Sequence, residues 1–156
     1  MRFICDAMLG SLARHLRILG LDTIYVRSTS DVARYRANGE VPYFFTKRKF
    51  QSIPYGNAVY VESNHVTGQL KEVKKIVLPY VSERDFMRRC IKCNVLLAEV
   101  NKDEVESLVP EFVFHRYSTF KSCPSCKKVY WEGTHVERMK GWIRKMREPS
   151  GEQDET

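Results

Sequence analysis

Four of the five cysteines fall into two Cys-x-x-Cys pairs, Cys90 with Cys93 and Cys123 with Cys126. Each such turn directs two thiolates at one centre, and two turns supply the four sulfur ligands of a tetrahedral zinc site. The alternatives are two disulfides or one redox-active pair. A disulfide framework needs an export signal, and a thioredoxin-like motif needs a single pair near a β-α-β pattern; neither condition is met. We therefore predict a closed, structural Zn²⁺ site with no position for water or substrate.

A second candidate for chemistry is Asp6, at the end of the first apolar stretch. Residues 2–6 read as a short buried strand that ends in this carboxylate. In open α/β sheets ligands gather at the carboxyl ends of the strands, so an acid there is well placed for chemistry. Asp is also a preferred N-cap, and a helix is predicted to follow directly. The sequence alone leaves both roles open.

The charge of the chain favours an anionic partner. The formal net charge is +7 and the pI about 9.2, which is typical of proteins that bind nucleic acid. Residues 1–80 contain 12 Lys and Arg against 6 Asp and Glu, so the first half carries most of the excess. No apolar stretch approaches the length of a membrane span, and the N-terminus does not read as a signal peptide. A reducing cytoplasm suits four zinc-bound thiolates and a free Cys5.

The hydrophobic pattern predicts an α/β domain followed by a small zinc ribbon. Apolar residues at helical spacing predict a helix that ends at Gly20, between strands at 2–6 and 21–26. Further strands are predicted at 43–46 and 57–61, and a helix at 69–78. Strands at 96–100 and 128–131, a short helix at 102–105 and a basic amphipathic helix at 135–147 complete the pattern. We expect the domains to be 1–80 (α/β), 84–134 (ribbon), 135–147 (C-terminal helix) and 148–156 (a disordered tail).

The segment from Asp6 to Gly20, DAMLGSLARHLRILG, resembles the opening signature of the Mut-7 C-terminal (PIN-like) ribonuclease family. Thr46, Lys47 and Arg48 stand where that family has a Thr-Arg-Asp after its third strand, and the two Cys-x-x-Cys pairs match its C-terminal ribbon. The segment VYWEGTH at 129–135 is similar to the ribbon exit, so the resemblance covers about residues 2–142.

The resemblance implies a PIN-like fold with a parallel sheet and flanking helices, and acidic residues at the strand ends that bind Mg²⁺ or Mn²⁺ for RNA cleavage. Carboxylates hold such hard cations, which activate water and stabilise charge on the phosphodiester. Carried over by position, Asp6 matches the first acidic position and Asp31 the second, and Glu62 is the remaining candidate for a catalytic acid. Asp31 can equally be a plain N-cap for the segment after it, and Glu62 a solvated side chain.

Two positions depart from the family pattern. The acidic position after the fourth strand falls near Ser63 and Asn64, which leaves Glu62 as the only carboxylate candidate there. Arg48 stands where the family has its third-strand Asp, and a cation there repels a divalent ion. It is suited instead to pairing with a carboxylate or to binding an RNA phosphate. Several cations are predicted to line one RNA-binding surface, although a charge run is often only a solvated loop. They are Arg14, Arg17, Lys47, Arg48 and Lys49.

Three functions follow as hypotheses. The first is a metal-dependent ribonuclease with an incomplete acidic site. The second is a catalytically inactive module on the same fold that binds RNA or a ribonucleoprotein, and the third is a protein–protein adaptor that docks through its ribbon and C-terminal helix. Salt-sensitive RNA affinity without added metal would separate the second from the third.

Overall fold

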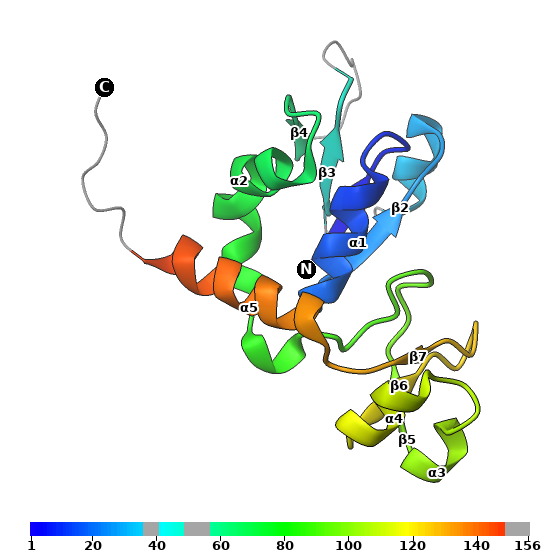
Figure 1. The fold of residues 1–156 in the computed structure, drawn as a ribbon. Helices are drawn as coiled ribbons and strands as arrows, with labels where there is room; N and C mark the ends of the chain where they lie inside the picture. The colour runs from blue at the N-terminus through cyan, green and yellow to red at the C-terminus, as the bar shows by residue number, and fades with distance from the viewer. Residues whose placement is uncertain (36–40, 49–56, 149–156) are drawn as a thin grey trace.

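The computed structural model describes residues 1–35, 41–48 and 57–148. Four parallel strands form the first sheet in the order β2-β1-β3-β4 (Figure 1). The chain passes from β1 to β2 on one side and then returns to the other side of β1 for β3. The strand order therefore reverses between β1 and β3, the place at which open α/β sheets bind ligands. The strands are β1 (Arg2–Cys5), β2 (Asp22–Tyr25), β3 (Tyr43–Thr46) and β4 (Ala58–Tyr60).

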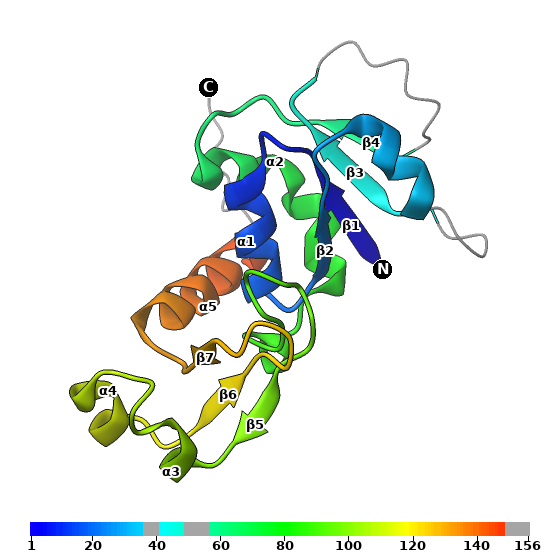
Figure 2. The ribbon, with the colours of Figure 1, turned by 90° about the vertical axis from the view of Figure 1, so that its right-hand side faces the viewer.

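Helices cover both faces of this sheet. Alternate strand residues face opposite sides, so Phe3 and Phe45 share one core with three α-helices, whereas Ile4 and Phe44 pack against Val32 of a 3-10 helix. Figure 2 shows α1, α2 and α5 together on one side of the strands. The helices are α1 (Gly10–Ile18), α2 (Val66–Val77), α5 (Thr134–Arg147) and the 3-10 helix η1 (Thr29–Tyr35).

The first helix follows the predicted pattern. Leu12, Ala13 and Leu16 are fully buried against the sheet because they recur at helical spacing on one face. Gly20 follows the helix at φ +87°, where a Cβ would lie 2.2 Å from the carbonyl oxygen of Asp85. Glycine is therefore required for the turn and for the close approach of the segment near Asp85.

The ribbon is a three-stranded antiparallel sheet in the order β5-β6-β7, at the opposite end of the molecule from β4 (Figures 1 and 2). Two short helices pack on it through a separate apolar cluster that includes Val105, Val113 and Phe120. The prediction missed β6 and α4 because their aromatic segment has neither a strand nor a helix period. The elements are β5 (Ala98–Val100), α3 (Lys102–Val105), α4 (Glu111–Arg116), β6 (Phe120–Ser122) and β7 (Val129–Tyr130).

The ribbon and the α/β domain share one core. Two 3-10 turns, η2 (Leu78–Tyr80) and η3 (Glu83–Asp85), lead into the ribbon, and α5 returns from it to the face of the sheet that α1 covers. Cys90, Cys123 and Ile143 belong to the same buried cluster as Phe3. The division into separate domains at about residue 80 therefore stays a prediction, and the tail at 149–156 lies outside the described residues.

The predicted fold class, a parallel α/β sheet with flanking helices and a ribbon that carries the cysteines, is confirmed. Element limits differ slightly: α2 begins at Val66 instead of residue 69. Gly68 allows this extension, because a Cβ there would lie 2.2 Å from Ser63 Oγ. In the described part of the chain, every helix is too short or too polar to cross a bilayer.

Candidate functional site

The two Cys-x-x-Cys turns have the same internal hydrogen bonds. The amides of Cys90 and Cys123 each donate to the carbonyl five residues later, at 2.8 and 3.0 Å. The amide of Cys93 donates to the sulfur of Cys90 at 3.3 Å, and the amide of Cys126 donates to the sulfur of Cys123 at 3.4 Å. The residue after each turn, Asn94 or Lys127, has a positive φ of 66° or 67° and closes the loop onto the first carbonyl. Both turns are thus preformed to present two sulfurs each.

The four sulfurs converge on one point between the turns. Their Sγ atoms all lie within 4.8 Å of one another, and those of Cys90 and Cys126 are 3.7 Å apart. All four cysteines are free, and a disulfide would need a much shorter S–S distance of about 2.05 Å. Tetrahedral geometry at a Zn–S distance of about 2.3 Å requires sulfurs about 3.8 Å apart. The cluster can therefore hold a metal ion such as zinc.

Tyr130, which the sequence analysis did not single out, supports the cluster. Its hydroxyl lies 3.1 Å from Cys90 Sγ and accepts a hydrogen bond from the Ile91 amide at 3.2 Å. Burial would raise the pKa of Cys90, but hydrogen bonds from Tyr130 and the backbone outweigh it and lower this pKa to about 7. The surroundings of Cys90 therefore favour a thiolate, the form that binds metal. Only the fold could reveal this partner, since Tyr130 is 40 residues away.

Arg17 and Asn94 hold the first cysteine turn against the α/β domain. The Arg17 guanidinium donates to the carbonyls of Thr23, Ile91 and Lys92 at 3.0, 2.8 and 3.2 Å. Asn94 accepts from the Thr23 amide at 3.0 Å and donates to Asp22 at 2.7 Å. Arg17 is only 9% exposed, and its guanidinium is bound to backbone carbonyls. Its role as an RNA-binding residue stays a prediction.

Asp6 lies where the strand order reverses, and it is surrounded by donors. Its Oδ2 accepts from the Thr46 hydroxyl at 2.6 Å and from the Lys47 amide at 3.0 Å. Its Oδ1 accepts from the Met8 amide at 2.9 Å, and the side chain is buried. These bonds tie the ends of β1 and β3 together. Asp6 is not the N-cap of α1, which is Leu9, because the Asp6 turn precedes the helix.

The other predicted catalytic acids lie on separate elements. Asp31 is in the first turn of η1, and Glu62 is exposed after β4. Among the described residues, groups of three or more metal-ligating side chains comprise the four cysteines alone. The catalytic roles of Asp6, Asp31 and Glu62 therefore stay predictions.

The predicted cations at the β3 end are placed beside Asp6. Lys47 follows β3, and its Nζ donates to the carbonyls of Glu62 and Ser63 at 2.9 and 2.8 Å. Arg48 is exposed, and its amide donates to Thr46 Oγ1 at 3.0 Å. Glu72, which the sequence analysis did not identify, accepts the amides of residues 62 and 63 and orders the same loop. Arg14 is exposed on α1, and Lys49 lies outside the described residues.

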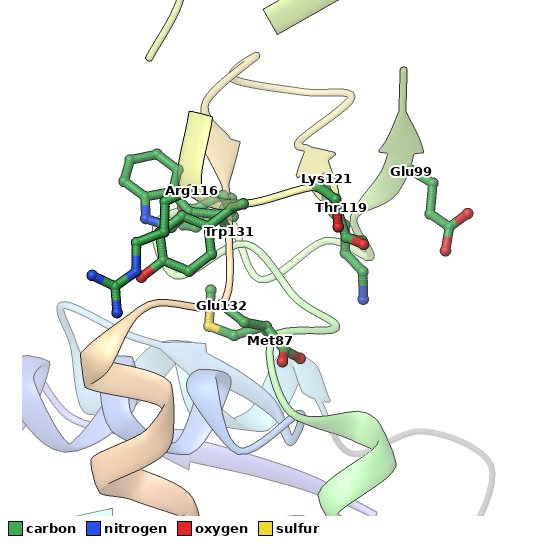
Figure 3. Close-up of a pocket in the computed structure, with 10 residues that line it drawn as sticks. Met87, Glu99, Arg116, Thr119, Lys121, Trp131 and Glu132 are labelled. Carbon is green, nitrogen blue, oxygen red and sulfur yellow. The ribbon is translucent and has the colours of Figure 1, made fainter. Parts of the chain in front are cut away.

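A hollow of about 490 Å³ lies on the ribbon (Figure 3). Figure 3 shows Arg116 and Trp131 on one flank, Thr119 and Lys121 on the other, and Met87 on the side of the α/β domain. Its lining also includes Glu99 and Glu132, so its two cations are balanced by two carboxylates. This hollow therefore has no clear preference for an anionic ligand.

The fold and these two sites define a parallel α/β domain that carries a four-thiolate cluster on an appended ribbon. A family model described as the Mut7-C RNAse domain matches residues 1–143, nearly the whole chain, and the protein belongs to this family. The predicted resemblance is thereby confirmed. Searches of curated proteins and of solved structures give no match. The family indicates a ribonuclease-type or related function, with RNA as the corresponding partner.

Proposed function

We propose that the protein is an RNA-binding member of the ribonuclease-type family whose Asp6 edge contacts phosphate instead of performing metal-dependent hydrolysis. The observation that carries this proposal is the set of neighbours of Asp6. Its carboxylate already accepts three hydrogen bonds, and the next two residues along β3's exit are the cations Lys47 and Arg48. Arg and Lys side chains are common donors to phosphate oxygens.

The described residues around Asp6 do not fit a Mg²⁺ or Mn²⁺ site. Such ions take several oxygen ligands, usually from more than one carboxylate. Among the described residues, Asp6 belongs to no group of three or more metal-ligating side chains, and its carboxylate already accepts three hydrogen bonds. We therefore derive no hydrolytic step from this edge.

The four cysteines would hold a structural zinc ion. Their donor set is soft and closed, and the residues that order it are buried between the ribbon and α1. The ion would connect β5–β7 to the turn that Arg17 and Asn94 hold. The cytoplasm, which keeps thiols reduced, is the compartment that suits this zinc site. The partner would be RNA, either free or within a ribonucleoprotein.

The test is to measure binding and cleavage of labelled single-stranded and structured RNA by zinc-loaded protein, with and without Mg²⁺ or Mn²⁺, beside Asp6→Asn. We expect salt-sensitive binding without added Mg²⁺ or Mn²⁺, and no cleavage that depends on Asp6. Cleavage that Asp6→Asn abolishes would establish the metal-dependent ribonuclease instead. Absence of RNA binding at low salt would overturn the proposal.

A further inference from the structure

A groove of about 520 Å³ runs between α1 and the cysteine turns. One wall is α1 from Gly10 to Arg17, and the other is formed by Lys92 of the first turn and Lys128 after the second. Tyr25, at the end of β2, also lines the groove, next to Gly10 of α1. The groove therefore brings together three parts of the chain that are far apart in the sequence.

The lining of this groove is cationic. Four of its eight residues are Lys or Arg and none is a carboxylate, unlike the balanced hollow on the ribbon. Arg14, Lys92 and Lys128 are exposed, whereas Arg17 lies buried beneath them with its guanidinium bound to backbone carbonyls. Concave surfaces lined by one sign of charge attract ligands of the opposite sign. The groove is thus suited to a polyanion.

An aromatic ring stands beside these cations. Tyr25 is 41% exposed, and its hydroxyl donates to the carbonyl of Ala7 at 2.6 Å. The hydroxyl bond fixes the ring against the first turn of α1, next to Gly10. Alternation of cations with an exposed aromatic ring is the arrangement on which unpaired bases stack while phosphates are neutralised.

The groove leads towards the Asp6 edge. Ala7, which holds Tyr25, directly follows Asp6, so this part of the groove adjoins the place where β1 and β3 end. The wall opposite α1 includes the first cysteine turn, which Arg17 and Asn94 fasten to α1 and β2. The cysteine cluster therefore sets the position of both groove lysines.

We propose that this groove binds a segment of single-stranded RNA, with phosphates on Arg14, Lys92 and Lys128 and a base stacked on Tyr25. The strand then runs from the cysteine turns to the Asp6 edge. This inference rests on the proposed function and names the surface that performs it. Single-stranded RNA fits because its bases are free to stack, whereas a helix presents mainly its phosphates. An acidic peptide would use the cations without needing the ring.

The experiment is fluorescence anisotropy with a labelled single-stranded oligoribonucleotide at several salt concentrations. The groove variant is Lys92→Glu with Lys128→Glu, and the charge-matched control is Lys71→Glu with Lys75→Glu on the exposed side of α2. Loss of two phosphate contacts should lower the slope of log affinity against log salt by about 1.4, and the control should leave this slope nearly unchanged.

Tyr25 gives an independent test with little change in charge. Tyr25→Leu should weaken RNA binding about tenfold, within the range for loss of one stacked base, while Tyr25→Phe should bind within about twofold of the wild type. An acidic peptide of equal charge should bind Tyr25→Leu and wild type alike. Zinc content and circular dichroism establish that each variant is folded.

The outcomes separate the two proposals. If the wild type fails to bind RNA, both the proposed function and the groove are wrong. If the wild type binds RNA but the groove and control pairs weaken it equally, the groove alone is wrong. Equal affinity of the Leu and Phe variants would likewise overturn the stacking role of Tyr25.

Discussion

The cysteine cluster and the Asp6 edge both gather polar side chains at the ends of strands and turns, but they differ in what faces those side chains. At the cluster, four cysteine sulfurs converge within 4.8 Å of one another, and backbone amides donate hydrogen bonds to two of them. At the edge, one carboxylate faces three donors, and cations follow it in the chain. The first arrangement gathers charge for a metal ion, whereas the second already neutralises it.

Removal of metal should have the largest effect, because the cluster orders the ribbon. We expect about one zinc per chain, and a binding free energy of about 10 kcal/mol or more that is lost on chelation, with collapse of the C-terminal half. Metal analysis and hydrogen exchange measure this. Cys93→Ala should show the same collapse, whereas Cys5→Ala, which alters a buried cysteine outside the cluster, should keep its zinc. A metal-free ribbon that stays folded would contradict the four-thiolate site.

Arg17→Met tests whether Arg17 holds the first cysteine turn against the α/β domain. The substitution leaves the carbonyls of Thr23, Ile91 and Lys92 without their charged donor, which should cost about 3 kcal/mol in the free energy of unfolding. Arg14→Met on the exposed side of the same helix is the matched control and should cost less than about 0.5 kcal/mol. Urea denaturation compares the two. Equal costs would show that Arg17 does not fasten the ribbon.

Arg48→Asp should make the Asp6 edge, like the cysteine cluster, attractive to a metal cation. The substitution replaces a cation near Asp6 with a second carboxylate, so the affinity for Mn²⁺ should increase by about tenfold. The gain is smaller than at a buried site because Arg48 is exposed to solvent. Calorimetry measures the affinity, and Lys145→Asp on the exposed side of α5 is the control. No gain over the control would remove Arg48 from the vicinity of the edge.

The smallest effect concerns pH at the contact between α1 and α5. Burial, and then the proximity of His15 and Arg138, lower the pKa of His135 below its ordinary value of 6.5. The rings of His15 and His135 lie 5.7 Å apart. The unfolded state therefore binds this proton more readily than the folded state, so the contribution of His135 to stability is lost as pH decreases through 6.5 towards the lower pKa of the folded state.

His135→Gln removes this titrating group. The free energy of unfolding of the wild type relative to His135→Gln should therefore decrease over the same pH interval. Zinc loss affects both proteins alike and cancels in the difference. A difference that stays constant with pH would show that the pKa of His135 is not lowered in the folded protein.

Much of this architecture could be predicted because its signals are local. The strand before Asp6, the apolar face of α1 and its end at Gly20 depend on residues within a few turns of one another. The aromatic segment at 112–122 could not be assigned from its pattern. Its fold into α4 and β6 depends on packing against Val105 and Val100, which lie elsewhere in the ribbon.

The sequence by itself determined the two cysteine turns, since each turn fixes its two sulfurs through bonds spanning at most five residues. It also determined the position of Asp6 at the end of a strand and the basic character of the first half. Only the tertiary structure decided that Arg17 turns inward to carbonyls 74 and 75 residues away, and that Tyr25 meets Lys92 and Lys128 in one groove. The physical reason is that a side chain's direction depends on what the fold buries beside it, which the spacing of residues along the chain does not specify.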